Sequence, residues 1–186
     1  MKRLNLGCGF DKRVGWVNAD NFEACLPDLF VDIRTTPWPI EDNEFDYILM
    51  KHVLEHVGQT FEEFTNIIKE LYRVSSPNGS IEIHVPHYRH DTWWSDPTHV
   101  RAFNLLTFKM MSKRQNDEWI AQKANNTMLS YVMGVNFEVV EAVQVYDQAW
   151  WQQVEQGKIS KEQLRVMAKT QWGVVKELQV KLRVVK

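Results

Sequence analysis

Cysteine is scarce in this sequence, with only Cys8 and Cys25 among 186 residues. Two cysteines without Cys-x-x-Cys spacing do not make a disulfide framework or a usual structural zinc site, and they fit a reducing compartment. Long hydrophobic runs are also missing, since none approaches the roughly 20 residues that cross a membrane. The first residues enter a predicted strand directly, without an apolar secretory segment. These absences predict a cytoplasmic protein with no membrane partner.

The chain also has no large excess of either charge. Its 22 Lys and Arg residues nearly balance 24 Asp and Glu residues, which gives a net charge of -2 and an isoelectric point near 6.3. Proteins that bind nucleic acid usually carry a basic stripe, so this composition disfavours DNA or tRNA as a partner. A hydrophobic content of 44% and a length of 186 residues suit one globular domain with its own core. We therefore expect a single domain over residues 1–186.

A glycine turn followed by two acidic residues organises the first part of the chain. Residues 4–6 predict a short buried strand, and Gly7 and Gly9 allow the backbone to turn tightly against a ligand. Asp20 and Asp32 each close a further short apolar run. Ligands of open parallel sheets bind beyond the carboxyl ends of the strands, so the turn and both carboxylates should meet in one crevice. A carboxylate in that position can accept hydrogen bonds from both hydroxyls of a ribose.

The connection after the glycine turn is unusual in two ways. A nicotinamide dinucleotide site would need a third glycine at the position of Lys12, which argues against a dehydrogenase. Only the nine residues 7–15 separate the first two predicted strands, whereas a parallel crossover normally needs about a dozen or more. We therefore expect at most one helical turn in this connection.

Hydrophobic periodicity predicts the elements in the middle of the chain. Residues 45–50 form a compact apolar run typical of a buried strand. Thr60 and Glu63 predict the start of a helix. The apolar residues at helical spacing after them are Phe61, Phe64, Ile67, Ile68 and Leu71. Residues 75–80 contain Pro and Asn-Gly and predict a turn, and residues 81–85 alternate as a fifth strand.

The last part of the chain predicts further short elements. Residues 105–111 predict a short helix, and residues 112–127 predict a polar, mobile connection. Residues 137–146 are rich in strand formers, and residues 178–184 alternate between apolar and polar side chains. We expect these last two segments to be neighbouring strands.

A long insertion separates these two strands. Residues 147–172 predict two helices, the first capped by Asp147 and the second by Ser160 with Gln163 in a capping box. Hairpin loops are usually only a few residues long, so a connection of this size should have a purpose. We expect either a lid over the site or a homodimer contact.

Several of these motifs occur in the order found in one enzyme family. They are Gly7-Cys8-Gly9, Asp20, Asp32, the approach 39–46 to the fourth strand, His52 to His56, Arg73-Val74 and Pro77-Asn78-Gly79. From Leu4 to about Phe103 the chain resembles class I S-adenosylmethionine (SAM)-dependent methyltransferases of the type 11 kind, with a shortened first crossover. The resemblance implies an α/β fold. This fold would be a three-layer Rossmann-like sandwich with a mostly parallel sheet and a C-terminal antiparallel strand pair.

The resemblance also implies SAM as the cofactor. The residues expected to bind it are Gly7, Cys8, Gly9, Asp20, Asp32, Ile33 and His52. By this likeness the glycine turn lines the methionine part, and the first aspartate binds the ribose hydroxyls. The second aspartate, with the isoleucine after it, holds the adenine.

The segment after the fifth strand, residues 87–103, is rich in side chains able to do chemistry. A loop beyond a strand's carboxyl end faces the same crevice as the glycine turn, so we expect it to form the wall for the acceptor substrate. The SAM cofactor already carries the reactivity, and the protein must mainly align the acceptor. If the acceptor is a hydroxyl, a base must take its proton, and our candidates are His87, Asp96 and His99. The acceptor itself is not identified, and the prediction is a small molecule or a sugar-like one.

Two other functions stay open at this point. The segment from His52 to His56, with Glu55, has the His-x-x-Glu-His pattern of inverted zinc peptidases, in which both imidazoles would share one helix face. Such an enzyme needs a third ligand on a distant helix, and no carboxylate stands out for that role, so we expect no metal. The shortened first crossover instead leaves room for a SAM-binding protein without catalytic activity.

Overall fold

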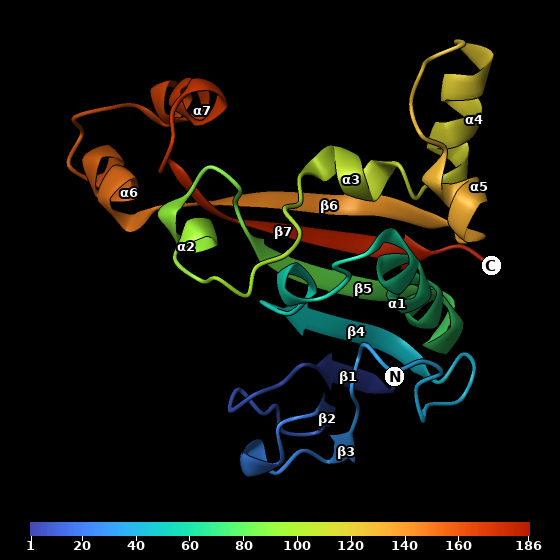
Figure 1. The fold of residues 1–186 in the computed structure, drawn as a ribbon. Helices are drawn as coiled ribbons and strands as arrows, with labels where there is room; N and C mark the ends of the chain where they lie inside the picture. The colour runs from blue at the N-terminus through green and yellow to red at the C-terminus, as the bar shows by residue number, and fades with distance from the viewer.

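The computed structural model describes all residues from Met1 to Lys186, and its centre is one seven-stranded sheet. The strands are β1 (Arg3–Leu6), β2 (Val17–Asp20), β3 (Leu29–Phe30), β4 (Phe45–Lys51), β5 (Ser75–Pro86), β6 (Phe137–Tyr146) and β7 (Val175–Val184). Their order is β3-β2-β1-β4-β5-β7-β6 (Figure 1). The first five strands are parallel, and β7 is antiparallel to both β5 and β6. The predicted α/β Rossmann-like fold with a C-terminal antiparallel pair is confirmed.

The helices are distributed unevenly around this sheet. They are η1 (Glu23–Cys25), η2 (Leu54–His56), α1 (Phe61–Val74), α2 (Asp91–Trp94), α3 (Leu105–Lys109), α4 (Lys113–Ala121), α5 (Leu129–Met133), α6 (Gln148–Glu155) and α7 (Lys161–Thr170). In Figure 1, α1 and α3 lie across the face of the sheet toward the viewer. The connections from β1 to β4 contain no α-helix, only η1. Loops therefore replace the helices that a full three-layer sandwich would have beside β1, β2 and β3.

The main core forms where α1 packs against the alternating strands. Residues Ile81, Ile83 and Val85 of β5 are buried and pair across the ladder with Leu182, Val180 and Leu178 of β7. Thr60 caps α1 as predicted, since its Oγ1 accepts a hydrogen bond from the Glu63 amide at 3.1 Å. Most of the predicted helix stripe is buried, but Phe61, at the first helical position, is 50% exposed.

The prediction of a mobile connection over residues 112–127 was wrong, because helix α4 begins at Lys113. Its cap is Ser112, whose Oγ accepts a hydrogen bond from the Gln115 amide at 3.1 Å. Asn116 is fully buried, and its side chain bonds the Met110 carbonyl at 3.0 Å and the Ser130 amide at 3.1 Å. The hydrogen bonds of this polar side chain join α4 to its neighbours. Polarity in this segment therefore does not indicate a solvent-exposed, mobile connection.

The prediction of a separate turn at residues 75–80 was also wrong, since β5 begins at Ser75. Phe45 of β4 pairs with Ser75, and Tyr47 pairs with Ser80. The residues between the two pairs on β5 form a bulge, in which Asn78 takes a left-handed φ of 61°. The Pro and Asn-Gly signals were correct locally, but the bend lies inside the strand pairing.

The insertion forms both predicted helices with both predicted caps. Asp147 Oδ1 accepts from the Ala149 amide at 2.9 Å, and Ser160 and Gln163 form a reciprocal capping box. The two helices enclose a small core of their own that consists of Leu164, Ala168, Val174 and Val175. In Figure 1, α6 and α7 lie near α2, at the end of the sheet toward which β4 points.

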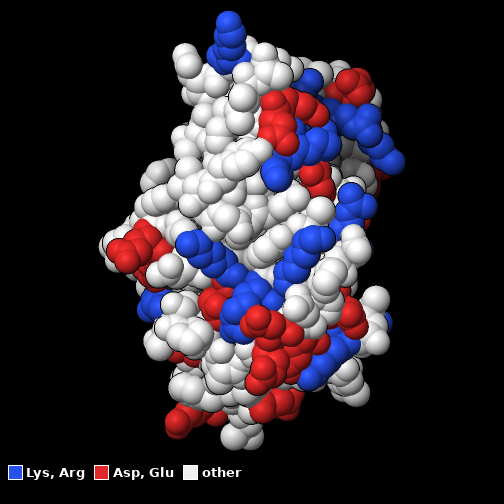
Figure 2. Space-filling model, turned by 90° about the vertical axis from the view of Figure 1, so that its right-hand side faces the viewer, with Lys and Arg blue, Asp and Glu red and all other residues white.

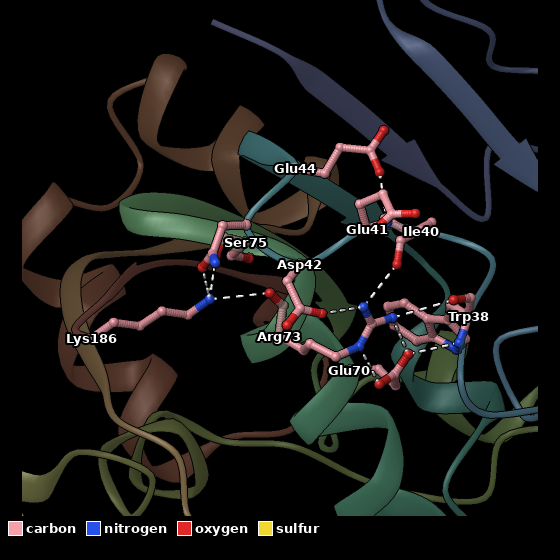
Figure 3. Close-up of polar contacts among 10 residues, drawn as sticks. Trp38, Ile40, Glu41, Asp42, Glu44, Glu70, Arg73, Ser75 and Lys186 are labelled. Carbon is pink, nitrogen blue, oxygen red and sulfur yellow. Dashed lines mark hydrogen bonds and ion pairs between the residues drawn. The ribbon is translucent and has the colours of Figure 1, made fainter.

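A network around Arg73 of α1 fixes the long loop between β3 and β4 (Figure 3). The guanidinium donates to both carboxylate oxygens of Glu70, each at 2.7 Å, and to Asp42 at 2.7 Å. It also donates to the carbonyls of Ile40 and Trp38, at 2.8 and 3.2 Å. This network holds in place a loop that contains no helix.

Basic and acidic side chains both lie at the amino ends of the parallel strands. Figure 2 shows this side of the molecule, on which basic and acidic residues lie close together and form no continuous basic stripe. No helix has the length and apolar character needed to cross a bilayer.

Candidate functional site

A cavity of about 310 Å³ opens at the carboxyl ends of β1, β2 and β4. Its lining includes Gly7, Gly9, Asp20, Asp32, Ile33 and His52. The other lining residues are Asn21, Val31, Arg34, Val53, His56 and Val57. The structure therefore brings together six of the seven residues that the sequence assigned to the cofactor.

The glycine turn is built by positive backbone angles and a close contact. Gly7 has a φ of +73° and Gly9 a φ of +48°. The amides of Gly7 and Cys8 both donate to the Ala19 carbonyl, at 2.8 and 3.1 Å. A Cβ on Gly7 would come within 2.3 Å of a methyl group of Val53, whereas one on Gly9 would meet nothing within 4 Å. Only glycine fits at the first position, and the second faces open space.

Backbone amides orient both acidic side chains. Asp20 accepts from the Gly9 amide at 2.7 Å through Oδ2 and from the Phe22 amide at 2.9 Å through Oδ1. Asp32 Oδ1 accepts from the Arg34 amide at 3.0 Å. A carboxylate oxygen has two lone pairs, so each carboxylate keeps the capacity to accept from a ligand hydroxyl or amine.

Cys8 does not line the cavity with the two glycines beside it. Its side chain is only 4% exposed, and burial together with the neighbouring Cys25 raises the pKa of its thiol to about 11. The thiol is therefore protonated and unreactive at neutral pH. Cys8 contributes its backbone to the turn, and its side chain belongs to the packing behind it.

A second cavity of about 330 Å³ adjoins the first. It is lined by His52, Glu55, His56, Pro86, Thr92, Asp96, His99, Lys176 and Glu177, so His52 and His56 border both cavities. Asp96 and His99, two of the predicted catalytic residues, lie here. His87 does not, because it lines a separate cavity with Tyr88 and Leu105.

Sequence reasoning missed one acidic residue of the second cavity. Outside the zinc pattern, the sequence predicts a structural or site-wall contact for Glu55 and His56, but nothing in it indicates Glu177. Glu177 comes from β7, far along the chain, and reaches the site because that strand is inserted beside β5. Only the antiparallel pairing of β7 could have indicated it.

His52 connects the two cavities as a positively charged group. It follows β4 with a left-handed φ of +55°, which is uncommon outside glycine. Its Nε2 lies 2.8 Å from Glu177 Oε2, and its Nδ1 lies 3.4 Å from Glu55 Oε1. The hydrogen bond to Glu177, followed by the nearby carboxylate of Glu55, raises the pKa of His52 to about 9, despite the opposing effect of burial. The imidazole is therefore protonated at neutral pH.

The zinc-peptidase pattern does not form the expected helix. Only the short 3-10 turn η2, Leu54–His56, is present, and His52 precedes it. The Nε2 of His52 is directed at Glu177. His52 and His56 thus do not form the pair of ligands on one helix face that this hydrolase would need.

We expect Glu177→Gln to lower the pKa of His52 from about 9 toward its ordinary value of 6.5. A raised imidazole pKa stabilises the folded state fully below 6.5, and this contribution is lost as pH rises through about 9. NMR titration of the imidazole would measure the pKa, and melting curves at pH 6 and pH 9.5 would measure the linked stability. Glu141→Gln, on an exposed position of β6, is the matched control. An unchanged pKa in Glu177→Gln would contradict the assignment.

The chain is similar to known methyltransferases in part of its sequence and in its fold. Residues 16–83 match the family described as "Methyltransferase domain". A SAM-dependent methyltransferase from Archaeoglobus fulgidus has a TM-score of 0.54 at 16% identity, over 98% of this chain and 86% of that one. A SAM-dependent methyltransferase from Mesorhizobium loti has a TM-score of 0.52 at 16% identity, over 98% of this chain and 90% of that one. The [4+2]-cyclase SpnF has a TM-score of 0.54 at 14% identity, over 99% of this chain and 75% of that one. No curated protein matches the chain in sequence.

Proposed function

We propose that this chain belongs to the class I SAM-dependent methyltransferase family and binds SAM in the first cavity, which the match over residues 16–83 and the fold support. There it transfers the methyl group to a small polar acceptor in the second cavity. The observation that carries this proposal is that His52 and His56 border both cavities. Two ligands bound side by side would meet at these imidazoles. Methyl transfer needs such an in-line meeting of the donor carbon with the acceptor atom.

In the first cavity, the proposed roles follow the strand ends. The turn at Gly7 and Gly9 leaves room for the methionine part of SAM, and Asp20 accepts hydrogen bonds from the ribose hydroxyls. Asp32 and Ile33, one strand further along the sheet, bind the adenine. When bound, SAM supplies a methyl group activated by its sulfonium. The residues of this chain hold the two reactants in line and exclude water.

In the second cavity, the polar lining favours a hydroxylated acceptor over an apolar one. The proton of the acceptor hydroxyl needs a base within hydrogen-bond reach. Hydrogen bonds from Thr98 hold the pKa of Asp96 below its ordinary value, so Asp96 is ionised but a weak base. His99 donates from Nδ1 to the Trp93 carbonyl at 2.7 Å, which leaves its Nε2 free to accept a proton. His87 lies in another cavity and has no part in this proposal.

A SAM-binding protein without methyl transfer is the second candidate. The absence of an α-helix between β1 and β2 favours it, since a helix amino terminus there would assist binding of the cofactor's methionine part. The [4+2]-cyclase among the similar structures also indicates that this fold serves more than one chemistry.

Calorimetric titration with SAM and S-adenosylhomocysteine tests the proposal. We expect binding with one site per chain, weakened at least about 10-fold by Asp20→Ala and by Asp32→Ala, since a hydrogen bond to a charged group is worth roughly 1.5–3 kcal/mol. Asp46→Ala is the matched control. Asp46 lies at the start of β4, away from the cavity, and its carboxylate accepts a hydrogen bond from the Lys2 amide. Melting curves confirm that each variant folds.

Turnover separates the two candidates. S-adenosylhomocysteine release is measured with a panel of hydroxylated small molecules, and any acceptor-dependent release supports transfer. Tight SAM binding without release across the panel favours the non-catalytic alternative. If neither nucleoside binds the wild type, both candidates fail.

A further inference from the structure

We infer that Glu55, His56 and His99 form a binding site for one divalent transition-metal ion in the second cavity. One carboxylate oxygen and one nitrogen of each imidazole lie within 4.8 Å of one another. All three residues line the same cavity. Two imidazoles and a carboxylate are a common ligand set of catalytic zinc and iron centres.

The carboxylate of Glu55 is the strongest sign of a missing partner. The residue is only 1% exposed, and neither of its carboxylate oxygens has a hydrogen-bond partner. His52 Nδ1 lies 3.4 Å from Oε1 but lacks the geometry of a hydrogen bond. Buried charges in proteins are normally paired, hydrogen-bonded or bound to a metal. A cation between Glu55 and the two imidazoles would satisfy this side chain.

Hydrogen bonds at Nδ1 prepare both imidazoles to bind a cation through Nε2. His99 Nδ1 donates to the Trp93 carbonyl at 2.7 Å. His56 Nδ1 lies 2.8 Å from Thr98 Oγ1, which itself donates to Asp96 at 2.6 Å and so accepts from the imidazole. Each neutral ring therefore carries its proton on Nδ1 and a free lone pair on Nε2. Metal-binding histidines are usually oriented in this way by a second set of partners.

The backbone holds the three ligands in place. The amides of Val100 and Arg101 donate to the Glu55 carbonyl at 2.8 and 3.3 Å, which ties the loop with His99 to η2. Trp93 stacks on His99 with ring centroids 5.0 Å apart. The ligands thus come from two segments that are fixed to one another without the ion, and a site of this kind binds with little rearrangement.

The ligand types select the ion. Calcium, magnesium and manganese prefer oxygen ligands, whereas imidazole nitrogen suits Zn²⁺, Ni²⁺ and Fe²⁺. Three protein ligands leave coordination positions open toward the cavity. The role of the ion rests on the proposed function: it would bind the acceptor oxygen and ease loss of its proton. His99 would then hold the ion, and Asp96 would remain to take the proton.

The experiment is calorimetric titration of chelator-treated protein with Zn²⁺ and with Ni²⁺, without SAM. We expect one ion per chain, and an affinity at least 100-fold lower in Glu55→Gln, His56→Asn and His99→Asn. His87→Asn, in a separate cavity, is the matched histidine control. Cys8→Ser/Cys25→Ser tests the other cluster of metal-binding side chains, which consists of Cys8, Asp20 and Cys25. Both control variants should keep the wild-type affinity.

Thermal melting gives a second readout that a purely structural role would not reproduce. Metal should raise the melting temperature of the wild type, because a ligand that binds only the folded state stabilises it. Glu55→Gln should fold and lose this metal-dependent rise. The inference is overturned if no ion binds stoichiometrically, if Glu55→Gln binds as the wild type does, or if the double cysteine variant abolishes binding.

The same protein is also titrated with SAM, which separates the two proposals. Binding of SAM without any metal site leaves the proposed function standing and removes the metal. Binding of metal without binding of SAM supports the metal site and rejects the proposed function.

Discussion

Arg73→Met is expected to destabilise the folded protein by about 3–5 kcal/mol, the usual cost of breaking a buried ion pair by removing one partner. Glu70 is 7% exposed, and its carboxylate is held by Arg73 and by the Trp38 amide at 2.7 Å (Figure 3). Burial raises the pKa of Glu70, but the hydrogen bonds from Arg73 and from the Trp38 amide, together with the charge of Arg73, outweigh burial and hold it below its ordinary value. Without the guanidinium, the carboxylate is left buried and largely unpaired.

Chemical denaturation of wild type and variant would measure this loss, and the melting temperature should fall by roughly 10 °C for a chain of this size. Arg114→Met is the matched control. Arg114 also pairs with two carboxylates, Glu118 and Glu138, but its side chain is 65% exposed and its ion pairs are screened by solvent, so a much smaller loss of stability is expected. The double variant Glu70→Met/Arg73→Met should recover part of the loss, because it removes the unpaired charge. Equal effects of the two single arginine variants would contradict the role of the network.

Gly7→Ala is expected to cost about 2–4 kcal/mol, because it combines two separate penalties. An alanine in the left-handed region costs about 1 kcal/mol. Forcing a methyl group into a packed contact costs typically 1–3 kcal/mol more. The new Cβ would lie 2.3 Å from a side-chain methyl group of Val53, which must move together with the segment that carries His52.

Gly9→Ala separates the two penalties, since φ is positive there too but nothing lies within 4 Å. It should lose only about 1 kcal/mol in urea unfolding. Gly7→Ala/Val53→Ala should recover much of the packing penalty. A Gly9→Ala variant as unstable as Gly7→Ala would show that backbone angle, rather than contact with Val53, governs the turn.

Local sequence signals predicted most of the fold because the elements follow local physical rules. The caps at Thr60, Asp147 and Ser160 each depend on a side chain and an amide two or three residues away. Helix α4 was not predicted because its buried face includes Asn116, whose hydrogen-bond partners lie outside this helix. A polar side chain that is satisfied by tertiary hydrogen bonds cannot be told from a solvated one in the sequence.

The candidate site likewise contains residues that the sequence predicts and residues that it does not. The residues of the first cavity were predictable, because Gly7, Asp20 and Asp32 end successive strands and the topology of a parallel sheet brings such ends together. The second cavity was predictable only in part. Asp96 and His99 fold back onto η2, whereas His87, only nine residues before Asp96, faces a different cavity. The path of a loop depends on its packing, and no periodicity in the sequence encodes it.

The insertion of β7 between β5 and β6 affects how the chain must be completed during synthesis. A nascent chain that has not reached residues 175–184 can form all five parallel strands, yet the outer edge of β5 is left without a partner. Unpaired strand edges favour association with other chains. Glu177 joins His52 only after that stage. Ribosome-bound or truncated forms of this protein should therefore contain the glycine turn and both aspartates, but lack Glu177, the stronger of the two carboxylates that keep His52 protonated.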